Sequence, residues 1–126
     1  MKTVVVIDDE YAIVETLVDV LELYGYACVT ASNGEEGLEL IKQKHPDLVI
    51  TDLMMPIMDG GELVAALRAD PRYRELPIIV TSAAQHPTGF ASEPASRFVY
   101  IRKPFSVSEL LHHIRQLTER DPSQPA

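Results

Sequence analysis

The strongest constraint on the fold is a set of short hydrophobic runs, each followed at once by a polar or charged side chain. Residues 4–7 are Val-Val-Val-Ile, and Asp8 and Asp9 follow directly. The same rule holds for the runs 48–51 before Asp52, 78–81 before Ser82 and 99–102 before Lys103. Continuous β-branched runs are typical of strands buried on both faces of a parallel sheet. The chain therefore predicts an α/β fold, with helices covering both sides of the sheet.

Helical segments are expected between these strands. Residues 12–24 carry apolar side chains at helical spacing and end at Gly25, a common terminator. A further strand is expected at 27–31, and a last helix up to about residue 120. Three helices are expected to start at residue pairs with the separation of a capping box, namely Asn33 with Glu36, Asp59 with Glu62 and Ser106 with Glu109.

Strands and helices alternate along the chain, and right-handed crossovers then give a doubly wound sheet. We expect a flavodoxin-like, five-stranded parallel sheet of order 2-1-3-4-5. Residues 84–97 fit this plan badly, because they contain Pro87, Gly89 and Pro94 and only Phe90 as a large apolar side chain. The fourth helix is therefore expected to be irregular or shortened.

Composition limits the function. The 126 residues include 19 acidic and 11 basic side chains, a net charge of −8, which disfavours direct binding to nucleic acid or to anionic membranes. No apolar run approaches the roughly 20 residues that span a bilayer, and the apolar stretch before Asp8 is too short for the core of a signal peptide. One cysteine, Cys28, excludes an internal disulfide. We expect a cytoplasmic domain over residues 1–120, with 121–126 as a flexible tail or the start of a linker.

The polar strand ends predict a site. Ligands bind to open α/β sheets at the carboxyl ends of the strands, where Asp8, Asp9, Asp52, Ser82 and Lys103 are expected to meet. Carboxylates suit Mg²⁺, a hard cation that prefers oxygen ligands and commonly shares them with a phosphate. A lysine and a hydroxyl can hold phosphoryl oxygens.

The string Asp-Leu-Met-Met-Pro-Ile-Met-Asp-Gly at 52–60, with the Asp8-Asp9 pair, Ser82-Ala83 and Lys103-Pro104-Phe105, closely resembles the receiver domain of bacterial two-component response regulators. The resemblance covers about residues 3–118. It implies that Asp52 accepts a phosphoryl group from phosphohistidine on a sensor histidine kinase or a histidine phosphotransfer protein. It also implies Mg²⁺ bound by Asp9, Asp52 and the backbone carbonyl of Met54, with Asp8 acting mainly through water.

The resemblance further implies a conformational switch. Ser82 would move toward the phosphate and Tyr100 would turn inward, which changes binding to a downstream target protein. The bond between Lys103 and Pro104 is implied to be cis. The domain would be a signalling module rather than an enzyme in the usual sense, although it promotes its own phosphorylation and dephosphorylation.

Two other functions remain open. The chain can be a receiver-like docking domain that works without phosphorylation, an alternative suggested by the unusual fourth unit. A magnesium-dependent phosphohydrolase is disfavoured, because Met54 stands where such an enzyme needs an acidic residue two beyond its nucleophile. The sequence does not decide whether the domain stands alone or belongs to a longer regulator.

Overall fold

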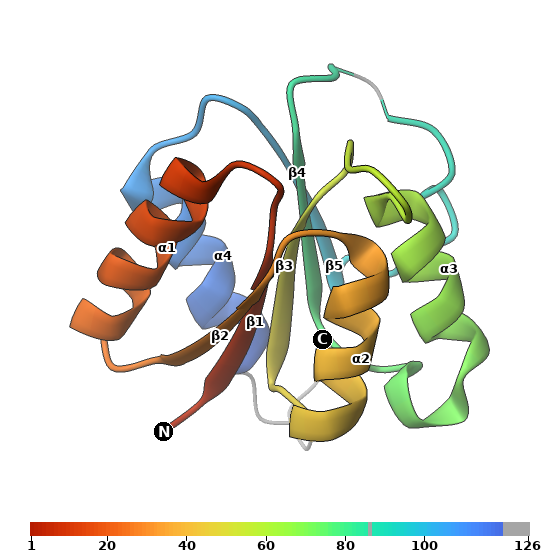
Figure 1. The fold of residues 1–126 in the computed structure, drawn as a ribbon, viewed down its shortest axis with the longest axis horizontal. Helices are drawn as coiled ribbons and strands as arrows, with labels where there is room; N and C mark the ends of the chain where they lie inside the picture. The colour runs from red at the N-terminus through yellow and green to blue at the C-terminus, as the bar shows by residue number, and fades with distance from the viewer. Residues whose placement is uncertain (86, 120–126) are drawn as a thin grey trace.

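The computed structural model describes residues 1–85 and 87–119. Its five parallel strands form one sheet of order β2-β1-β3-β4-β5, which confirms the predicted flavodoxin-like topology (Figure 1). The strands are β1 (Thr3–Ile7), β2 (Ala27–Ala31), β3 (Leu48–Asp52), β4 (Ile78–Ser82) and β5 (Phe98–Arg102). The helices are α1 (Tyr11–Leu23), α2 (Gly34–Lys44), α3 (Gly60–Ala69) and α4 (Val107–Thr118), with a short 3₁₀ turn at Pro71–Tyr73.

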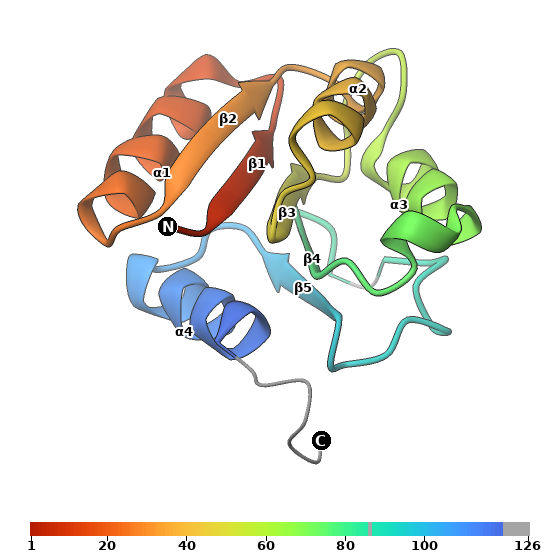
Figure 2. The same cartoon turned by 90° about the horizontal axis from the view of Figure 1, so that it is seen from below.

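The helices cover both faces of the sheet. Helices α1 and α4 lie on one face, and α2 and α3 lie on the other (Figure 2). Successive residues of β1 alternate between the two apolar clusters, with Val4 and Val6 in one and Val5 and Ile7 in the other. Every residue of β3 and β4 is buried. The uninterrupted apolar runs in the sequence follow from this double covering.

The predicted helix starts are present, but only one of the three expected capping boxes is complete. In α3, Asp59 and Glu62 form a complete capping box. In α2, Asn33 accepts a hydrogen bond from the N–H of Glu36, but the Glu36 carboxylate accepts from the hydroxyl of Ser32 instead of reaching back. The last helix starts at a Ser106 cap and ends at Thr118. The predicted tail at 121–126 lies outside the described residues.

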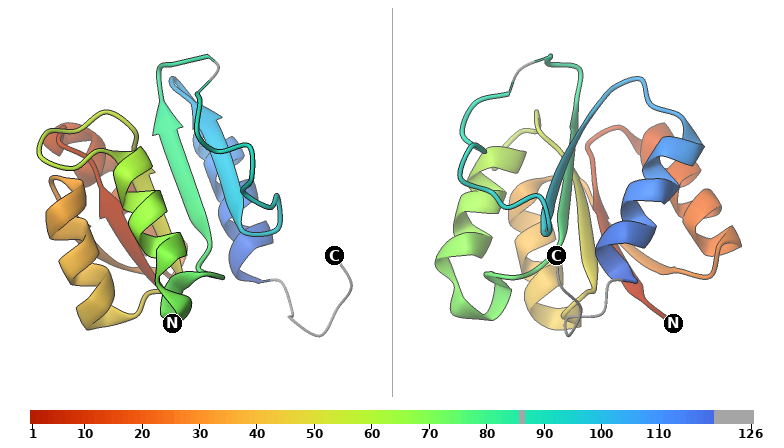
Figure 3. Two further views of the ribbon diagram at one scale, coloured as in Figure 1. Left: turned by 90° about the vertical axis from the view of Figure 1, so that its right-hand side faces the viewer. Right: turned by 180° about the vertical axis from the view of Figure 1, so that it is seen from behind.

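The segment between β4 and β5 is irregular, as predicted. Over residues 83–85 and 87–97, the structure contains turns and bends and no helix (Figure 3). Pro87 and Pro94 cannot donate backbone hydrogen bonds, and Gly89 has a φ of 96°, outside the helical region. This segment stands where the alternation of strands and helices would place a fourth helix.

Within residues 1–85 and 87–119, no helix is both long and apolar enough to cross a membrane.

Candidate functional site

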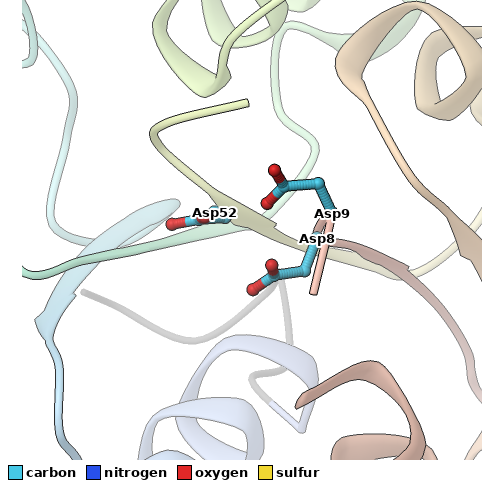
Figure 4. Close-up of side chains that lie close together, drawn as sticks. All are labelled: Asp8, Asp9 and Asp52. Carbon is cyan, nitrogen blue, oxygen red and sulfur yellow. The ribbon is translucent and has the colours of Figure 1, made fainter. Parts of the chain in front are cut away.

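Three carboxylates gather at the carboxyl ends of adjacent strands. Asp8 and Asp9 follow β1, and Asp52 is the last residue of β3, which pairs with β1 in parallel. One carboxylate oxygen from each of the three lies within 4.8 Å of the others (Figure 4). Asp8 and Asp52 are buried, whereas Asp9 is exposed to solvent. The structure thus brings the predicted acidic residues together.

Backbone donors orient the two buried carboxylates. The N–H of Leu53 donates to Asp52 Oδ1 at 2.9 Å, and the N–H of Glu10 donates to Asp8 Oδ1 at 2.9 Å. Both donors belong to the connection that directly follows the strand, so the chain positions its own acidic side chains. Such hydrogen bonds favour a fixed carboxylate geometry before any ligand arrives.

Lys103 supplies the positive charge of the site. Its Nζ lies 3.3 Å from Asp8 Oδ2 and 3.4 Å from Asp52 Oδ1. Burial raises the pKa of the Asp52 carboxyl, and the charge on Asp8 raises it further, while Lys103 opposes both effects. Burial would lower the pKa of Lys103, but the charges and hydrogen bonds of Asp8 and Asp52 raise it above its ordinary value. Lys103 therefore acts as a built-in counter-ion for the acidic cluster.

Gly60 lets α3 begin directly beside Asp52. A Cβ at this position would lie 2.5 Å from the carbonyl oxygen of Asp52 and 2.9 Å from the Cα of Leu53. The N–H of Gly60 donates to the carbonyl of Leu53 at 2.8 Å. The sequence marked Gly60 as part of a motif, but only the packing shows its steric role.

Ser82 and Tyr100 are linked through Ala84. Ser82 is buried at the end of β4, and its Oγ accepts a hydrogen bond from the N–H of Ala84 at 3.1 Å. The hydroxyl of Tyr100, a half-buried residue of β5, donates to the carbonyl of Ala84. Sequence reasoning missed this role of Ala84, because it depends on backbone groups that any residue has. The two residues predicted to switch therefore share one contact point.

The remaining predicted residues lie around the cluster. The Lys103-Pro104 bond is cis, as the resemblance implied. The N–H of Lys103 donates to the carbonyl of Ser82 at 2.7 Å, which joins the ends of β5 and β4. Met54 lies in the connection after β3 with an exposed side chain, and metal binding by its carbonyl stays a prediction.

The donor set fits a hard divalent cation. Carboxylate oxygens from two strands converge, and they outnumber the single ammonium group beside them. Mg²⁺ is bound by one or two carboxylates together with waters and a phosphate. The arrangement can thus place a cation and a phosphoryl group beside Asp52, where the ammonium group of Lys103 can offset part of the added negative charge.

Comparison with known proteins establishes the family. Residues 4–115 match the model of the response regulator receiver domain. The chain belongs to the response regulator receiver family. Receivers are signalling modules that work with histidine kinases or phosphotransfer proteins.

The similarity extends to curated proteins and to solved structures. The chain is 40% identical to the probable transcriptional regulator ycf27 of Guillardia theta over 94% of its own length and 46% of that protein. It is 32% identical to the phosphate regulon transcriptional regulatory protein PhoB of Pseudomonas aeruginosa over 94% of its own length and 52% of that protein. This receiver therefore spans about half the length of these relatives.

Solved structures of response regulators share its fold. The chemotaxis response regulator CheY4 of Vibrio cholerae has a TM-score of 0.83 and 29% identity, over 93% of this chain and 98% of that one. The receiver domain of the Francisella response regulator 1452 has a TM-score of 0.83 and 30% identity, over 95% of this chain and 98% of that one.

Proposed function

We propose that this receiver accepts a phosphoryl group on Asp52 from phosphohistidine on a sensor kinase or phosphotransfer protein, in a Mg²⁺-dependent reaction. The new aspartyl phosphate then changes how the domain binds a downstream target protein. The observation that supports this most directly is the convergence of Asp8, Asp9 and Asp52 within 4.8 Å. Lys103 Nζ lies 3.4 Å from Asp52, which adds a cation for the incoming group.

The reaction is an in-line transfer to a carboxylate. An oxygen of Asp52 attacks phosphorus, the P–O bond forms, and the P–N bond to histidine breaks. The histidine nitrogen leaves with the electron pair and takes a proton from solvent. Asp52 is oriented for attack by the N–H of Leu53, and Lys103 can turn from the carboxylates to a phosphoryl oxygen.

The proposed metal ligands are Asp9 and Asp52 with the carbonyl of Met54, while Asp8 acts mainly through water. When bound, Mg²⁺ would offset the negative charge that develops on the phosphoryl oxygens. The buried side chain of Asp8 also faces Lys103 at 3.3 Å, so Asp8 helps to keep the ammonium group at the site.

Ser82 and Tyr100 are the proposed switch residues. The Ser82 hydroxyl can donate to a phosphoryl oxygen, and Ala84 connects this change to the Tyr100 hydroxyl. An aspartyl phosphate adds about −1.5 to −2 charges and strong acceptor oxygens, enough to bias a two-state surface. The downstream partner is proposed to be a protein rather than nucleic acid, because the chain carries a net charge of −8.

The test is the intact mass of the purified protein after incubation with acetyl phosphate and Mg²⁺. We expect a gain of about 80 Da, the mass of one phosphoryl group. The gain should be absent for Asp52→Asn and absent when a chelator removes the metal. Asp47→Asn is a suitable control, because Asp47 is an exposed aspartate that hydrogen-bonds the N–H of Thr3 at the other end of the strands.

Two results would contradict the proposal. An adduct that persists in Asp52→Asn would place the acceptor elsewhere. If no adduct forms with acetyl phosphate and none forms with a phosphohistidine donor, the domain works by docking alone.

A further inference from the structure

The irregular segment between β4 and β5 is held at its two ends in different ways. We call residues 83–85 the site arm, because they follow Ser82, and residues 90–97 the clamped arm, because they are tied to α3. The arms differ in the chemistry of their contacts.

The clamped arm is held by a partly buried ion pair. Arg68, near the end of α3, donates from Nε to Glu93 Oε1 at 2.9 Å. The two side chains are only 15% and 10% exposed. Nη2 of Arg68 also lies 3.4 Å from the carbonyl oxygen of Arg97. One guanidinium group therefore reaches both the middle and the end of the clamped arm.

The same arginine is anchored on its other side. Its Nη1 lies 3.0 Å from the carbonyl oxygen of Tyr73, 3.2 Å from that of Arg74 and 2.8 Å from that of Leu76. These carbonyls belong to the connection that enters β4. A planar guanidinium with several donors suits such a junction, and lysine could not replace it. Arg68 thus joins α3, the entry to β4 and the clamped arm.

Two further contacts support the clamped arm. The ring of Phe90 stacks on that of Phe98 in β5, with centroids 4.9 Å apart. Arg97 Nε pairs with Glu75 Oε2 at 2.9 Å, although the Glu75 side chain is 78% exposed. An exposed pair of this kind contributes little. Arg68 and Glu93 are therefore the main polar anchor.

The site arm has no comparable anchor among the described contacts. Its hydrogen bonds converge on Ala84, whose N–H donates to Ser82 Oγ and whose carbonyl accepts from Tyr100. Both partners are residues that phosphorylation is proposed to move. The site arm is therefore tied to the proposed switch residues, whereas the clamped arm is tied to α3, to the entry of β4 and to Phe98.

We propose that Arg68 and Glu93 are positioning residues that pin the clamped arm to α3, so that the rearrangement after phosphorylation is confined to the site arm and Tyr100. This inference rests on the proposed function of Asp52. It makes the clamped arm a fixed border of the part of the domain that responds to phosphorylation.

Backbone amide exchange measured by NMR tests the independence of the arms in the unphosphorylated protein. The N–H groups of Glu93 and Arg97 report on the clamped arm, and the N–H of Ala84 reports on the site arm. Glu93→Gln should speed exchange in the clamped arm about tenfold, because local opening becomes easier, and leave Ala84 unchanged. Tyr100→Phe should speed exchange at Ala84 and leave exchange at Glu93 and Arg97 unchanged.

Glu75→Gln is the matched control, because it makes the same chemical change in the exposed ion pair. It should alter exchange in the clamped arm by less than about twofold. Arg68→Lys keeps the charge but loses the planar guanidinium group. If Glu93→Gln folds poorly, Arg68→Lys replaces it in the test and should likewise speed amide exchange in the clamped arm. Equal acceleration in both arms of either variant would overturn the inference.

Amide exchange in the phosphorylated protein distinguishes the proposed positioning role of Arg68 and Glu93 from a purely structural role. After the mass gain is verified, exchange at Ala84 should change in the wild-type protein while Glu93 and Arg97 stay the same. In Arg68→Lys, the change caused by phosphorylation should spread into the clamped arm. A wild-type response in the clamped arm, or an unchanged pattern in the variant, would overturn the inference. If no adduct forms, the proposed function fails, and the unphosphorylated comparison still decides whether the arms are independent.

Discussion

At the scale of single residues, Lys103 controls the electrostatics of the site. It stands between two buried carboxylates, at 3.3 Å from Asp8 and 3.4 Å from Asp52. A buried charge that loses its partner is costly, because no water replaces the lost interaction. We therefore expect two effects of the lysine, since it stabilises the metal-free protein and would compete with a bound cation for the same oxygens.

Replacing Lys103 by methionine should expose this double role. Without Mg²⁺, we expect Lys103→Met to lower the free energy of unfolding by about 1 to 3 kcal/mol, because charged hydrogen bonds are lost. Added Mg²⁺ should raise the melting temperature of the variant more than that of the wild type. Thermal unfolding with and without Mg²⁺ measures both effects. Lys44→Met, at an exposed position, is the control and should change neither the free energy of unfolding nor the response to Mg²⁺. If Mg²⁺ raises the melting temperature of Lys103→Met no more than that of the wild type, Lys103 does not compete with the cation.

Cys28 offers a pH-dependent prediction. Burial, and then the charge on Glu22, raises the pKa of the Cys28 thiol to about 11. The reactive thiolate should be scarce in the folded protein at pH 8, so alkylation by iodoacetamide should stay slow and accelerate only toward pH 11. In protein unfolded by urea, alkylation should accelerate near pH 8.5, because the ordinary pKa of a cysteine thiol is about 8.5.

The same shift has a consequence for stability. Because the folded-state pKa of Cys28 lies above the unfolded one, the stability it contributes is fully present below about pH 8.5 and is lost as the pH rises toward 11. Rapid alkylation of the folded protein at pH 8 would contradict the raised pKa of the half-buried Cys28 thiol.

At the scale of elements, the connection from β3 to α3 depends on close backbone approach. Gly60→Ala would place a Cβ 2.5 Å from the carbonyl oxygen of Asp52. We expect it to destabilise the protein by about 1 to 3 kcal/mol, because backbone atoms must shift to relieve the clash. Urea unfolding measures the loss, and phosphorylation of Asp52 should slow as the acceptor is displaced.

Gly61→Ala is the matched control for Gly60→Ala. Its nearest atom is Asp59 Oδ1 at 3.3 Å, a side-chain atom that accepts the capping hydrogen bond from the N–H of Glu62. Because Gly61 lies within α3, the gain in helix propensity offsets a small shift of this cap, so alanine there should change the free energy of unfolding by less than about 1 kcal/mol. Equal losses in the two variants would show that general helix effects, rather than contact with Asp52, set the cost.

At the scale of the whole molecule, the proposed metal site can form only when the sheet is formed. Asp8 and Asp52 are separated in sequence but lie at the ends of paired strands, so Mg²⁺ should bind the folded state alone. At ten times its dissociation constant, Mg²⁺ should then stabilise the fold by about 1.4 kcal/mol and raise the melting temperature by about 5 °C. Scanning calorimetry checks this shift.

Ionic strength provides the control for the Mg²⁺ effect. KCl at matched ionic strength should give a much smaller shift, because screening does not require convergent ligands. Asp9→Asn should reduce the Mg²⁺ effect, whereas Asp47→Asn should leave it intact. An equal response to KCl and MgCl₂ would argue against a specific site.

Much of this architecture could be predicted from the sequence. The β-branched runs predicted strands buried on both faces, and the structure buries all of β3 and β4. Because parallel strands bring their carboxyl ends to one edge, the polar residues after each run were expected to meet there, and Asp8, Asp9, Asp52 and Lys103 do. The prolines and Gly89 between β4 and β5 likewise predicted an irregular segment. Local backbone preferences and hydrophobic periodicity determine these features, and both are properties of neighbouring residues.

Other features were decided only by the tertiary structure. The Arg68–Glu93 pair joins residues 25 positions apart, and nothing in the local sequence selects these two among the other charged side chains. Ala84 acquires its role because its backbone groups meet Ser82 and Tyr100. Gly60 is required because a carbonyl from another element lies 2.5 Å from where its Cβ would be. The sequence by itself determined which elements form and which residues reach the edge of the sheet. Which groups hold those elements in place depends on distances between remote parts of the chain, and these exist only after packing.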